Sequence, residues 1–259
     1  MSIKDLQSVI TLDNMRSVLN YDPSQSRDAE GQWTRGGVTG GLVKQSQELK
    51  STTFNEARTE MYEKHKVSVH SNEISDPKAL AVTKIVDTEL TRMSELNGPA
   101  MSNVRTHANL SIEYKEGKTF TRETGVHGST EVSGTYVDAN SGMYLAVGIK
   151  SKESKPKLNK MEHTVGDSMQ TVFRHEYGHH VWYKGMNRLQ REEFKSATAD
   201  LVGPKYNNWK TKHPVSQYAG TSSTELWAES FSAYTNSQYR RGSLPVSVES
   251  ALDRFVGGG

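Results

Sequence analysis

Residues 171–182, TVFRHEYGHHVW, place a glutamate and several histidines inside a segment that otherwise has the pattern of a buried helix. His175, Glu176 and His179 form the pattern HExxH, with the two histidines four residues apart. Residues at this spacing lie on one face of an α-helix, so both imidazoles can reach a single metal ion. Glu176 stands beside them, where its carboxylate can take a proton from a water molecule that the metal activates. The pattern therefore predicts a metal site on a helix.

The helix that carries this pattern is expected over residues 164–185. Thr164 or Asp167 could cap its N-terminus, and Gly185 offers a stop at its C-terminus. Gly178 would leave room for the close approach of a strand or a substrate.

Neighbouring residues are not expected to bind the metal. His180 follows His175 by five residues and so points away from the ligand face; we interpret it as a structural or surface histidine. The extended metzincin pattern would require glycine at 182 and histidine at 185, but the sequence has Trp182 and Gly185. The third ligand should therefore be an acidic residue on a later helix.

Two candidates for that ligand follow. Asp200 lies in SATADLV, and the stronger candidate, Glu225, lies in YAGTSSTELWAESFSAY, residues 218–234. Glu225 and Glu229 share one helical face with apolar residues, and Ser222 stands at capping-box spacing, which predicts that the helix begins there. Carboxylates on an apolar stripe are costly unless they are paired. Glu225 would bind the metal and Glu229 would accept the outer N–H of a ligand histidine; the alternative is a partly exposed helix whose acids face water.

HEYGHH, followed by Tyr218 and by ELWAE at residues 225–229, resembles the gluzincin peptidases, most closely the catalytic domain of the anthrax lethal factor type. The resemblance covers about residues 170–236 and does not extend to residues 1–100. It implies a zincin-like fold and three zinc ligands: His175, His179 and Glu225. It further implies that Glu176 is the general base, that Tyr218 donates a hydrogen bond to the oxyanion, and that Glu229 supports a ligand histidine. The same ligand types would also bind cobalt or manganese.

The order of elements predicts an α+β fold with an antiparallel or mixed sheet, an active-site helix and C-terminal helices. Asp76 and Pro77 favour the start of a helix over residues 77–95, within a largely helical region. Residues 109–122 have the pattern of a hairpin that turns at Glu116–Gly117, and residues 134–150 that of two strands around Asn140–Gly142. Later helices are expected over residues 164–185, 187–202 and 223–238. We divide the chain into an N-terminal helix and arm (1–42), a helical region (43–100) and a zincin-like catalytic domain (101–259).

Two further segments bear on the substrate. The strand at residues 142–150 precedes the active-site helix, and we expect it to lie along the edge of the cleft or to be an ordinary interior strand. The lysine-rich segment KSKESKPKLNK, residues 150–160, is expected to be a solvated connection, with contact to an acidic partner as the alternative.

The N-terminal part combines a short amphipathic helix over residues 3–20 with a flexible arm. The segment YDPSQSRDAEGQWTRGG, residues 21–37, is similar to a segment of tailed-phage head and portal-associated proteins. This resemblance implies a phage or prophage origin, a place in the virion, and phage head or portal proteins as partners of the arm. Trp33 either docks on such a partner or folds back onto its own domain.

Composition narrows the function classes. The chain has 259 residues, a formal net charge of +2 and no cysteine, so disulfides and thiolate metal sites are excluded and nucleic-acid binding is not favoured. We find no secretory signal and no apolar run long enough for a membrane helix. A soluble protein of the host cytoplasm, the virion or both is therefore expected, without a membrane partner.

The hypothesis from sequence is a zinc-dependent endopeptidase with Zn²⁺ as cofactor and a protein or peptide as substrate. One alternative is a virion structural or assembly protein that keeps a catalytically silent zincin fold. Another is a delivered toxin protease that cleaves a host protein.

Overall fold

The computed structural model of the protein describes the following residues: 48–72, 76–96, 98–99, 103–107, 110–115, 118–123, 133–137, 142–146, 152–206 and 210–256. The helix expected over residues 3–20, the arm over residues 21–42 and Trp33 lie outside these ranges.

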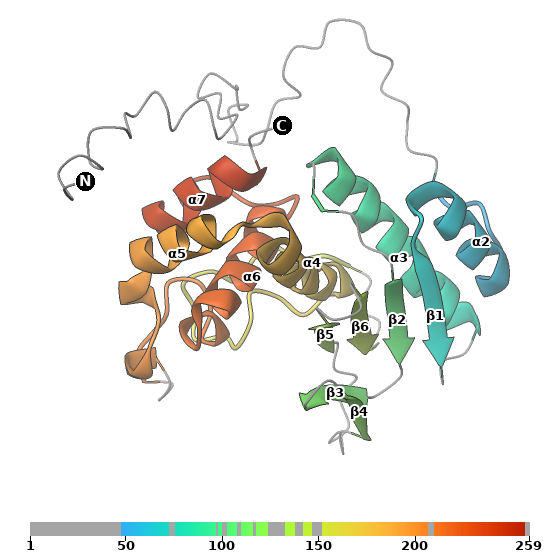
Figure 1. The fold of residues 1–259 in the computed structure, drawn as a ribbon, viewed down its shortest axis with the longest axis horizontal. Coiled ribbons are helices and arrows are strands. Elements are labelled where there is room, and N and C mark those ends of the chain that lie inside the picture. Colours follow the sequence, from blue (N-terminus) through green and yellow to red (C-terminus); the bar gives the residue numbers. More distant parts are fainter. Residues whose placement is uncertain are drawn as a thin grey trace, which may run out of the picture.

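Helices and strands follow one another in an α+β arrangement, as the sequence predicted (Figure 1). The first elements are α2 (Phe54–His65), β1 (Ser68–Asn72) and α3 (Asp76–Glu95). The next are β2 (Asn103–His107), β3 (Leu110–Lys115), β4 (Lys118–Glu123), β5 (Ser133–Val137) and β6 (Gly142–Ala146). The last helices are α4 (Met169–His180), α5 (Arg188–Ala197), α6 (Ser223–Tyr234) and α7 (Val246–Val256).

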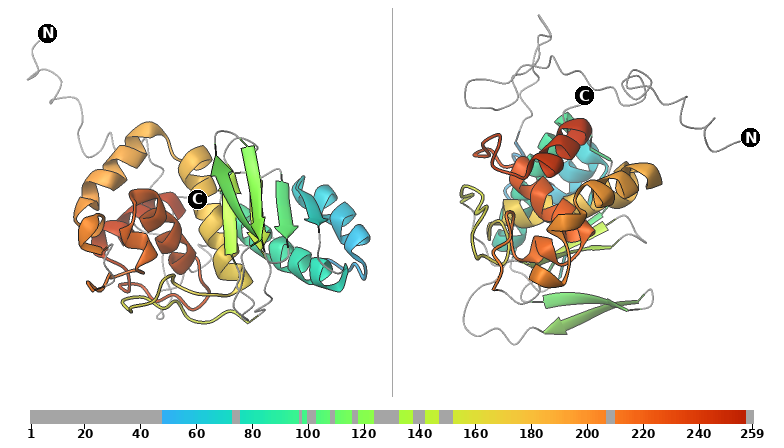
Figure 2. Two further views of the ribbon diagram at one scale, coloured as in Figure 1. Left: turned by 90° about the horizontal axis from the view of Figure 1, so that it is seen from below. Right: turned by 90° about the vertical axis from the view of Figure 1, so that its left-hand side faces the viewer.

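A mixed sheet of four strands has the order β1-β2-β6-β5 among the described strands. β1 and β6 run parallel to β2, whereas β5 runs antiparallel to β6. Parallel neighbours need a crossover connection, and α3 supplies it between β1 and β2. Figure 2 shows that α3 lies across one face of the sheet and that α2 lies at the end of the sheet formed by β1. The buried core includes residues of α3 and alternate residues of β6: Val82, Val86, Met143 and Leu145.

The prediction of a largely helical region over residues 43–100 is wrong at residues 68–72. They form β1, which pairs with β2 in a register that places Val69 opposite Val104. The sheet therefore joins the two regions that the sequence analysis separated at residue 100.

The other strand predictions are confirmed in part. β3 and β4 form the expected hairpin, whose last pair is Lys115 with Lys118, and β5 pairs with β6 so that Val137 lies opposite Gly142. β6 ends at Ala146 and lies between β2 and β5. The expectation that residues 142–150 form the edge of the cleft is therefore wrong, and the interior alternative holds. Among the described strands, β5 occupies that end of the sheet.

Helix α4, which carries the HExxH pattern, begins later than predicted. Ser168 caps α4, because its hydroxyl accepts a hydrogen bond from the backbone N–H of Thr171 at 3.2 Å. The caps expected at Thr164 or Asp167 are therefore wrong, although Gly185 ends the helix as predicted, after a π-helical turn at Val181–Gly185.

Helices α5 and α6 are also shorter than predicted. α5 ends at Ala197 and is followed by a short 3-10 turn, Ala199–Leu201, while α6 ends at Tyr234 rather than at residue 238. The sequence analysis assigned no helix to residues 246–256, where α7 lies. No helix in the described part of the chain combines the length and the apolar character needed to cross a membrane.

α4 and α6 lie side by side and approach closely at Gly178 (Figure 1). A Cβ atom at this position would lie 2.9 Å from the Cα atom of Ala228. The indole N–H of Trp227 donates to the carbonyl of Gly178 at 3.1 Å, and the hydroxyl of Ser232 donates to the carbonyl of Thr171 at 2.7 Å. The partner that Gly178 admits is thus helix α6, and not a strand or a substrate.

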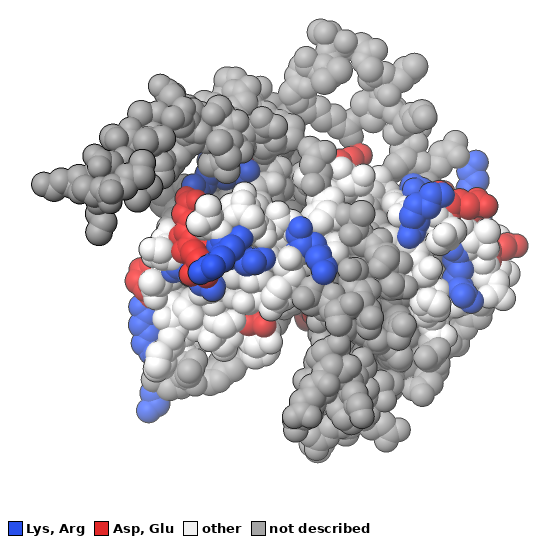
Figure 3. Space-filling model, viewed as in Figure 1, with Lys and Arg blue, Asp and Glu red and all other residues white. Residues whose placement is uncertain are grey.

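The lysine-rich loop is held at positions between its lysines. The side chain of Glu153 binds Arg174, the carbonyl of Ser154 accepts from Asn236 at 3.0 Å, and the N–H of Asn159 donates to the carbonyl of Pro214 at 2.9 Å. The exposed lysines of the loop are Lys152, Lys155 and Lys160. Figure 3 shows acidic side chains beside basic ones on the described part of one face of the molecule.

Candidate metal centre

Three side chains from α4 and α6 meet at one point. His175 and His179 come from successive turns of α4, and Glu225 comes from the first turn of α6. The Nε2 atoms of the two histidines are 3.2 Å apart. Oε2 of Glu225 lies 3.3 Å from Nε2 of His175 and 3.4 Å from Nε2 of His179. The three atoms therefore form a nearly equilateral triangle.

This triangle has the dimensions of one face of a tetrahedral metal site. Bonds of about 2.0–2.1 Å place the ligand atoms of a tetrahedron about 3.3–3.4 Å apart. In addition, Oε2 of Glu225 is buried and receives no well-aligned hydrogen bond from the described residues. A buried carboxylate oxygen normally has a partner, and a cation at the centre of the triangle would provide one. The residues therefore fit a divalent ion that prefers nitrogen and oxygen ligands.

The start of α6 presents Glu225 to the histidines. The hydroxyl of Ser222 caps the helix and accepts a hydrogen bond from the N–H of Glu225 at 3.1 Å, as predicted. In a complete capping box, the side chain at this position would turn back to the N–H of the cap residue. The carboxylate of Glu225 instead lies against His175 and His179. Its negative charge in the first turn is also favoured by the helix dipole.

Glu229, one turn further along α6, supports His175. Oε1 of Glu229 lies 2.8 Å from Nδ1 of His175, and Oε2 accepts a hydrogen bond from the backbone N–H of Val165 at 2.7 Å. Only 1% of the Glu229 residue surface is exposed, so the alternative in which this acid faces water is wrong. A carboxylate at Nδ1 favours the tautomer protonated there, which leaves the lone pair of Nε2 free to bind a metal ion.

The acids and histidines shift one another's pKa values. Burial by itself would lower the pKa of His175, but the carboxylates of Glu225, Glu229 and Glu176 outweigh burial and hold this pKa well above its usual value. Burial would raise the pKa of Glu225, but His175 and His179 outweigh it and hold this pKa well below its usual range. The cluster therefore favours a positive charge at its centre, which a proton or a metal ion can provide.

Glu176 and Tyr218 flank the triangle. Glu176 is buried on α4 next to the first ligand. The ring of Tyr218 stacks on that of His175 with 5.9 Å between the ring centroids. Burial and the negative charges of Glu225 and Glu176 raise the pKa of Tyr218, so its hydroxyl keeps its proton and remains a hydrogen-bond donor.

The loop that precedes α4 fixes the position of Tyr218. The N–H of Tyr218 donates to the carbonyl of His163 at 2.9 Å, and the ring centroids of these residues are 5.1 Å apart. The N–H of Gln217 donates to the carbonyl of Glu162 at 3.0 Å. The sequence analysis singled out neither His163 nor Val165. A backbone N–H carries no side-chain signature, and His163 belongs to no motif.

His180 and Asp200 lie outside the cluster. His180 is fully buried, with its ring 5.5 Å from that of Tyr177, so the structural interpretation is confirmed and the surface alternative is wrong. Asp200 is exposed on the turn after α5, where its carbonyl accepts a hydrogen bond from Lys205. The fold thus brings Glu225, and not Asp200, to the histidines.

The arrangement joins a metal-ligand set to a buried carboxylate and a phenolic donor. Hydrolysis of a polarised carbonyl uses these groups as Lewis acid site, general base and oxyanion donor. Comparison of the chain with protein-family models and with curated proteins finds no match.

Proposed function

We propose that the protein is a zinc-dependent endopeptidase with a zincin-like catalytic domain of the gluzincin type. The observation that carries the proposal is the triangle of ligand atoms from His175, His179 and Glu225, with sides of 3.2, 3.3 and 3.4 Å. Zn²⁺ is the metal that two histidines and one glutamate most often hold in metallopeptidases, where a fourth position stays open for water or substrate.

The roles of the protein groups follow from their positions. When bound, Zn²⁺ would polarise the scissile carbonyl and make a water molecule more acidic. Glu176 takes the proton of the attacking water and delivers it to the leaving amine. Tyr218 donates a hydrogen bond to the oxyanion that forms from the carbonyl oxygen. Glu229 keeps the ring of His175 oriented while these steps occur.

The edge strand β5 is the element that best suits an extended substrate. β5 contacts α4, runs antiparallel to β6 and has one sheet neighbour among the described strands. A peptide that adds to a sheet edge gains main-chain hydrogen bonds and keeps its side chains free for recognition. We therefore assign the substrate to the edge of β5, in place of residues 142–150, for which the sequence left the cleft edge and the sheet interior equally open.

The biological setting rests on the phage-like segment at residues 21–37. From this segment we infer that the enzyme is encoded by a phage or prophage and is carried in the virion. The arm would then bind head or portal proteins. A catalytically silent virion component and a delivered toxin protease are the competing settings. These three settings can be distinguished by comparing the wild type with Glu176→Gln in two assays. One assay measures virion assembly and the other measures host growth.

The primary test is the metal content per chain, measured by plasma mass spectrometry after excess metal is removed. About one zinc per chain is expected in the wild type, with a large loss in Glu225→Ala. Asp200→Ala is the matched control, because it removes an exposed acid that sequence reasoning had also considered, and it should keep its zinc. A wild type that binds no zinc would refute the metal site.

Catalysis is tested separately with Glu176→Gln. This variant should keep its zinc and lose cleavage of a peptide library, because it removes the base and retains the ligands. Full cleavage by Glu176→Gln would refute the mechanism but not the metal site.

A further inference from the structure

A cavity of about 390 Å³ opens on a different face of α4 from the metal ligands. Gln170 and Arg174, four residues apart on α4, line one side of it, and residues 84–92 of α3 line another. Glu48 and Leu49 from one segment, and Glu153 from another, complete the wall. The volume falls in the range of sites for small molecules.

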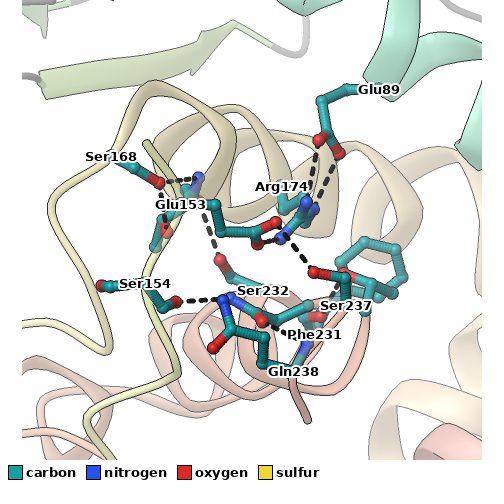
Figure 4. A network of polar contacts seen from close by, with 12 residues as sticks. Glu89, Glu153, Ser154, Ser168, Arg174, Phe231, Ser232, Ser237 and Gln238 are labelled. Atoms are coloured by element: carbon teal, nitrogen blue, oxygen red, sulfur yellow. Dashed lines mark hydrogen bonds and ion pairs between the residues drawn. The ribbon is translucent and has the colours of Figure 1, made fainter. Parts of the chain in front are cut away.

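The arginine on the α4 side of the cavity already has its partners. Nε and Nη2 of Arg174 donate to the two oxygens of Glu89 at 2.7 and 2.8 Å, and Nη1 donates to Glu153. The second oxygen of Glu153 accepts a hydrogen bond from Ser237 at 3.3 Å. Figure 4 shows Arg174 between these two acids. Each carboxylate oxygen in this network therefore accepts at least one hydrogen bond.

The acid on the α3 side is also engaged. Oδ1 of Asp87 lies 2.8 Å from Nζ of Lys64 and 2.7 Å from Nε2 of His65. The remaining charged groups of the wall are the exposed acid Glu48 and two cations, Lys84 and Arg92. Neither cation makes an ion pair or a side-chain hydrogen bond with the residues that the structure describes. They stand eight residues apart, about 12 Å along α3 and on one of its faces.

Arg92 is the group that most needs a partner. Its side chain is partly buried, and burial, together with repulsion from Arg174, lowers its pKa even though Glu89, Glu153 and Glu95 act in the opposite direction. An arginine nevertheless stays charged, so its guanidinium has to be stabilised by an acceptor. Water reaches the partly open cavity, but an anion would add an ion pair and a two-pronged hydrogen bond with the guanidinium of Arg92.

We propose that this cavity is a binding site for a small anion that carries a phosphate or carboxylate group, with Arg92 as its principal partner and Lys84 as a second cation at the wall. The site is separate from the metal centre, and its occupancy does not depend on peptidase activity. Because Arg174 directly precedes His175 in the sequence, an anion held here would border the helix that carries the metal ligands.

The test is isothermal titration calorimetry of the full chain with inorganic phosphate and, separately, with malonate, at an ionic strength kept constant with sodium chloride. Saturable binding of at least one of the two probes is expected, and the stronger one identifies the class of anion. Arg92→Met keeps the length of the aliphatic stem and should weaken binding at least tenfold. Lys84→Met should weaken it to a smaller extent.

Lys78→Met is the matched control, because Lys78 is an exposed lysine of α3 outside the cavity wall. It should bind the probe as the wild type does, and circular dichroism should show that all variants are folded. Equal binding by Arg92→Met and Lys78→Met would overturn the proposal, as would the absence of saturable binding of either probe to the wild type. Zinc content should be unchanged in Arg92→Met, so failure of this site and failure of the metal site are distinguishable.

Discussion

Nδ1 of His175 and Oε1 of Glu229 lie 2.8 Å apart, and this contact joins the helix that carries two of the proposed metal ligands to the helix that carries the third. The other oxygen of Glu229 binds the N–H of Val165, in the loop before α4. One carboxylate thus fixes three segments whose relative positions determine the triangle of ligand atoms.

Glu229→Gln should weaken zinc binding about 10- to 100-fold, the range found when a group that orients a ligand histidine is changed. The amide keeps the shape of the side chain, but only its oxygen can accept, so one of the two N–H partners loses its acceptor. Competition with a chromophoric chelator measures the affinity. Glu249→Gln is the control, because Glu249 is also buried and accepts from a backbone N–H, that of Gly242, outside the ligand cluster. Equal affinities in the two variants would contradict the role of Glu229.

Tyr218→Phe should lower kcat on a cleaved peptide about 10²- to 10³-fold, as expected when one oxyanion donor is removed. KM and zinc content should change little, because the phenyl ring still stacks on His175 and the hydroxyl is not part of the ligand triangle. A variant with unchanged kcat would show that the hydroxyl has no part in the reaction.

His163→Ala should lower kcat roughly 10- to 100-fold by loosening the ring of Tyr218, since small displacements of a positioned group have effects of this size. His163→Phe should restore much of the loss because it keeps a ring against Tyr218. Glu162→Ala is the neighbouring control, because its backbone still accepts from Gln217 while its side chain only approaches Lys157 at 3.9 Å. If both alanine variants behave alike, the ring of His163 has no positioning role.

Gly178→Ala should destabilise the fold by about 1–3 kcal/mol, although alanine normally stabilises a helix interior by about 1 kcal/mol over glycine. The sign reverses because the new Cβ would lie 2.9 Å from the Cα of Ala228, a backbone atom of α6. Urea denaturation at fixed zinc concentration measures the free energy of unfolding. Gly185→Ala should cost less, because its nearest neighbours are side-chain atoms of Val181 and Pro99 at 3.3 and 3.5 Å. A Gly178→Ala variant as stable as the wild type would contradict this close approach.

His213 should make the fold less stable in mild acid. Its ring is fully buried; Nε2 lies 2.8 Å from the carbonyl of Leu201, and Nδ1 accepts from the N–H of Val215 at 3.0 Å. Burial lowers the pKa of His213 below its usual value of about 6.5, outweighing the bond to Leu201 and the charge of Glu229, while Lys205 lowers it further. Because the folded pKa is the lower one, its stabilising contribution is complete above about pH 6.5 and is lost as the pH falls toward the folded pKa.

For one proton the slope is at most about 1.4 kcal/mol per pH unit. The free energy of unfolding, measured by urea denaturation between about pH 7.5 and 5.5, should therefore depend less on pH in His213→Gln than in the wild type. Parallel curves for His213→Gln and the wild type would refute the assignment.

Features encoded over a few neighbouring residues were predictable from the sequence. His175 and His179 share one helical face because they are four residues apart, and so do Glu225 and Glu229. Ser222, three residues before Glu225, likewise indicated where α6 begins. The hairpin of β3 and β4 was likewise local. A helix at α7 could also have been predicted, because Pro245 directly precedes an amphipathic segment, but none was expected there.

Features decided by distant contacts were not predictable. β1 has only five residues, and it is a strand because it pairs in parallel with β2. The whole of α3 separates β1 from β2 in the sequence. The bond between Arg174 and Glu89 joins residues 85 positions apart. Thr164, Asp167 and Ser168 can all cap a helix, and tertiary structure selects the one whose oxygen reaches the N–H of Thr171. The register of a four-stranded sheet similarly leaves little trace in any single strand.

Because Glu225 lies in the first turn of α6, binding of a metal ion would affect how fast the amide protons of this turn exchange with solvent. The opening turn of a helix is held by few backbone hydrogen bonds, so its amide protons normally exchange with solvent through local fraying. Here the N–H of Glu225 is bound to the Ser222 cap, and the carboxylate of the same residue faces the histidines of α4. Fraying of this turn would withdraw the proposed ligand Glu225 from the metal site. A bound cation would therefore slow the exchange of these amides in proportion to its affinity for the site.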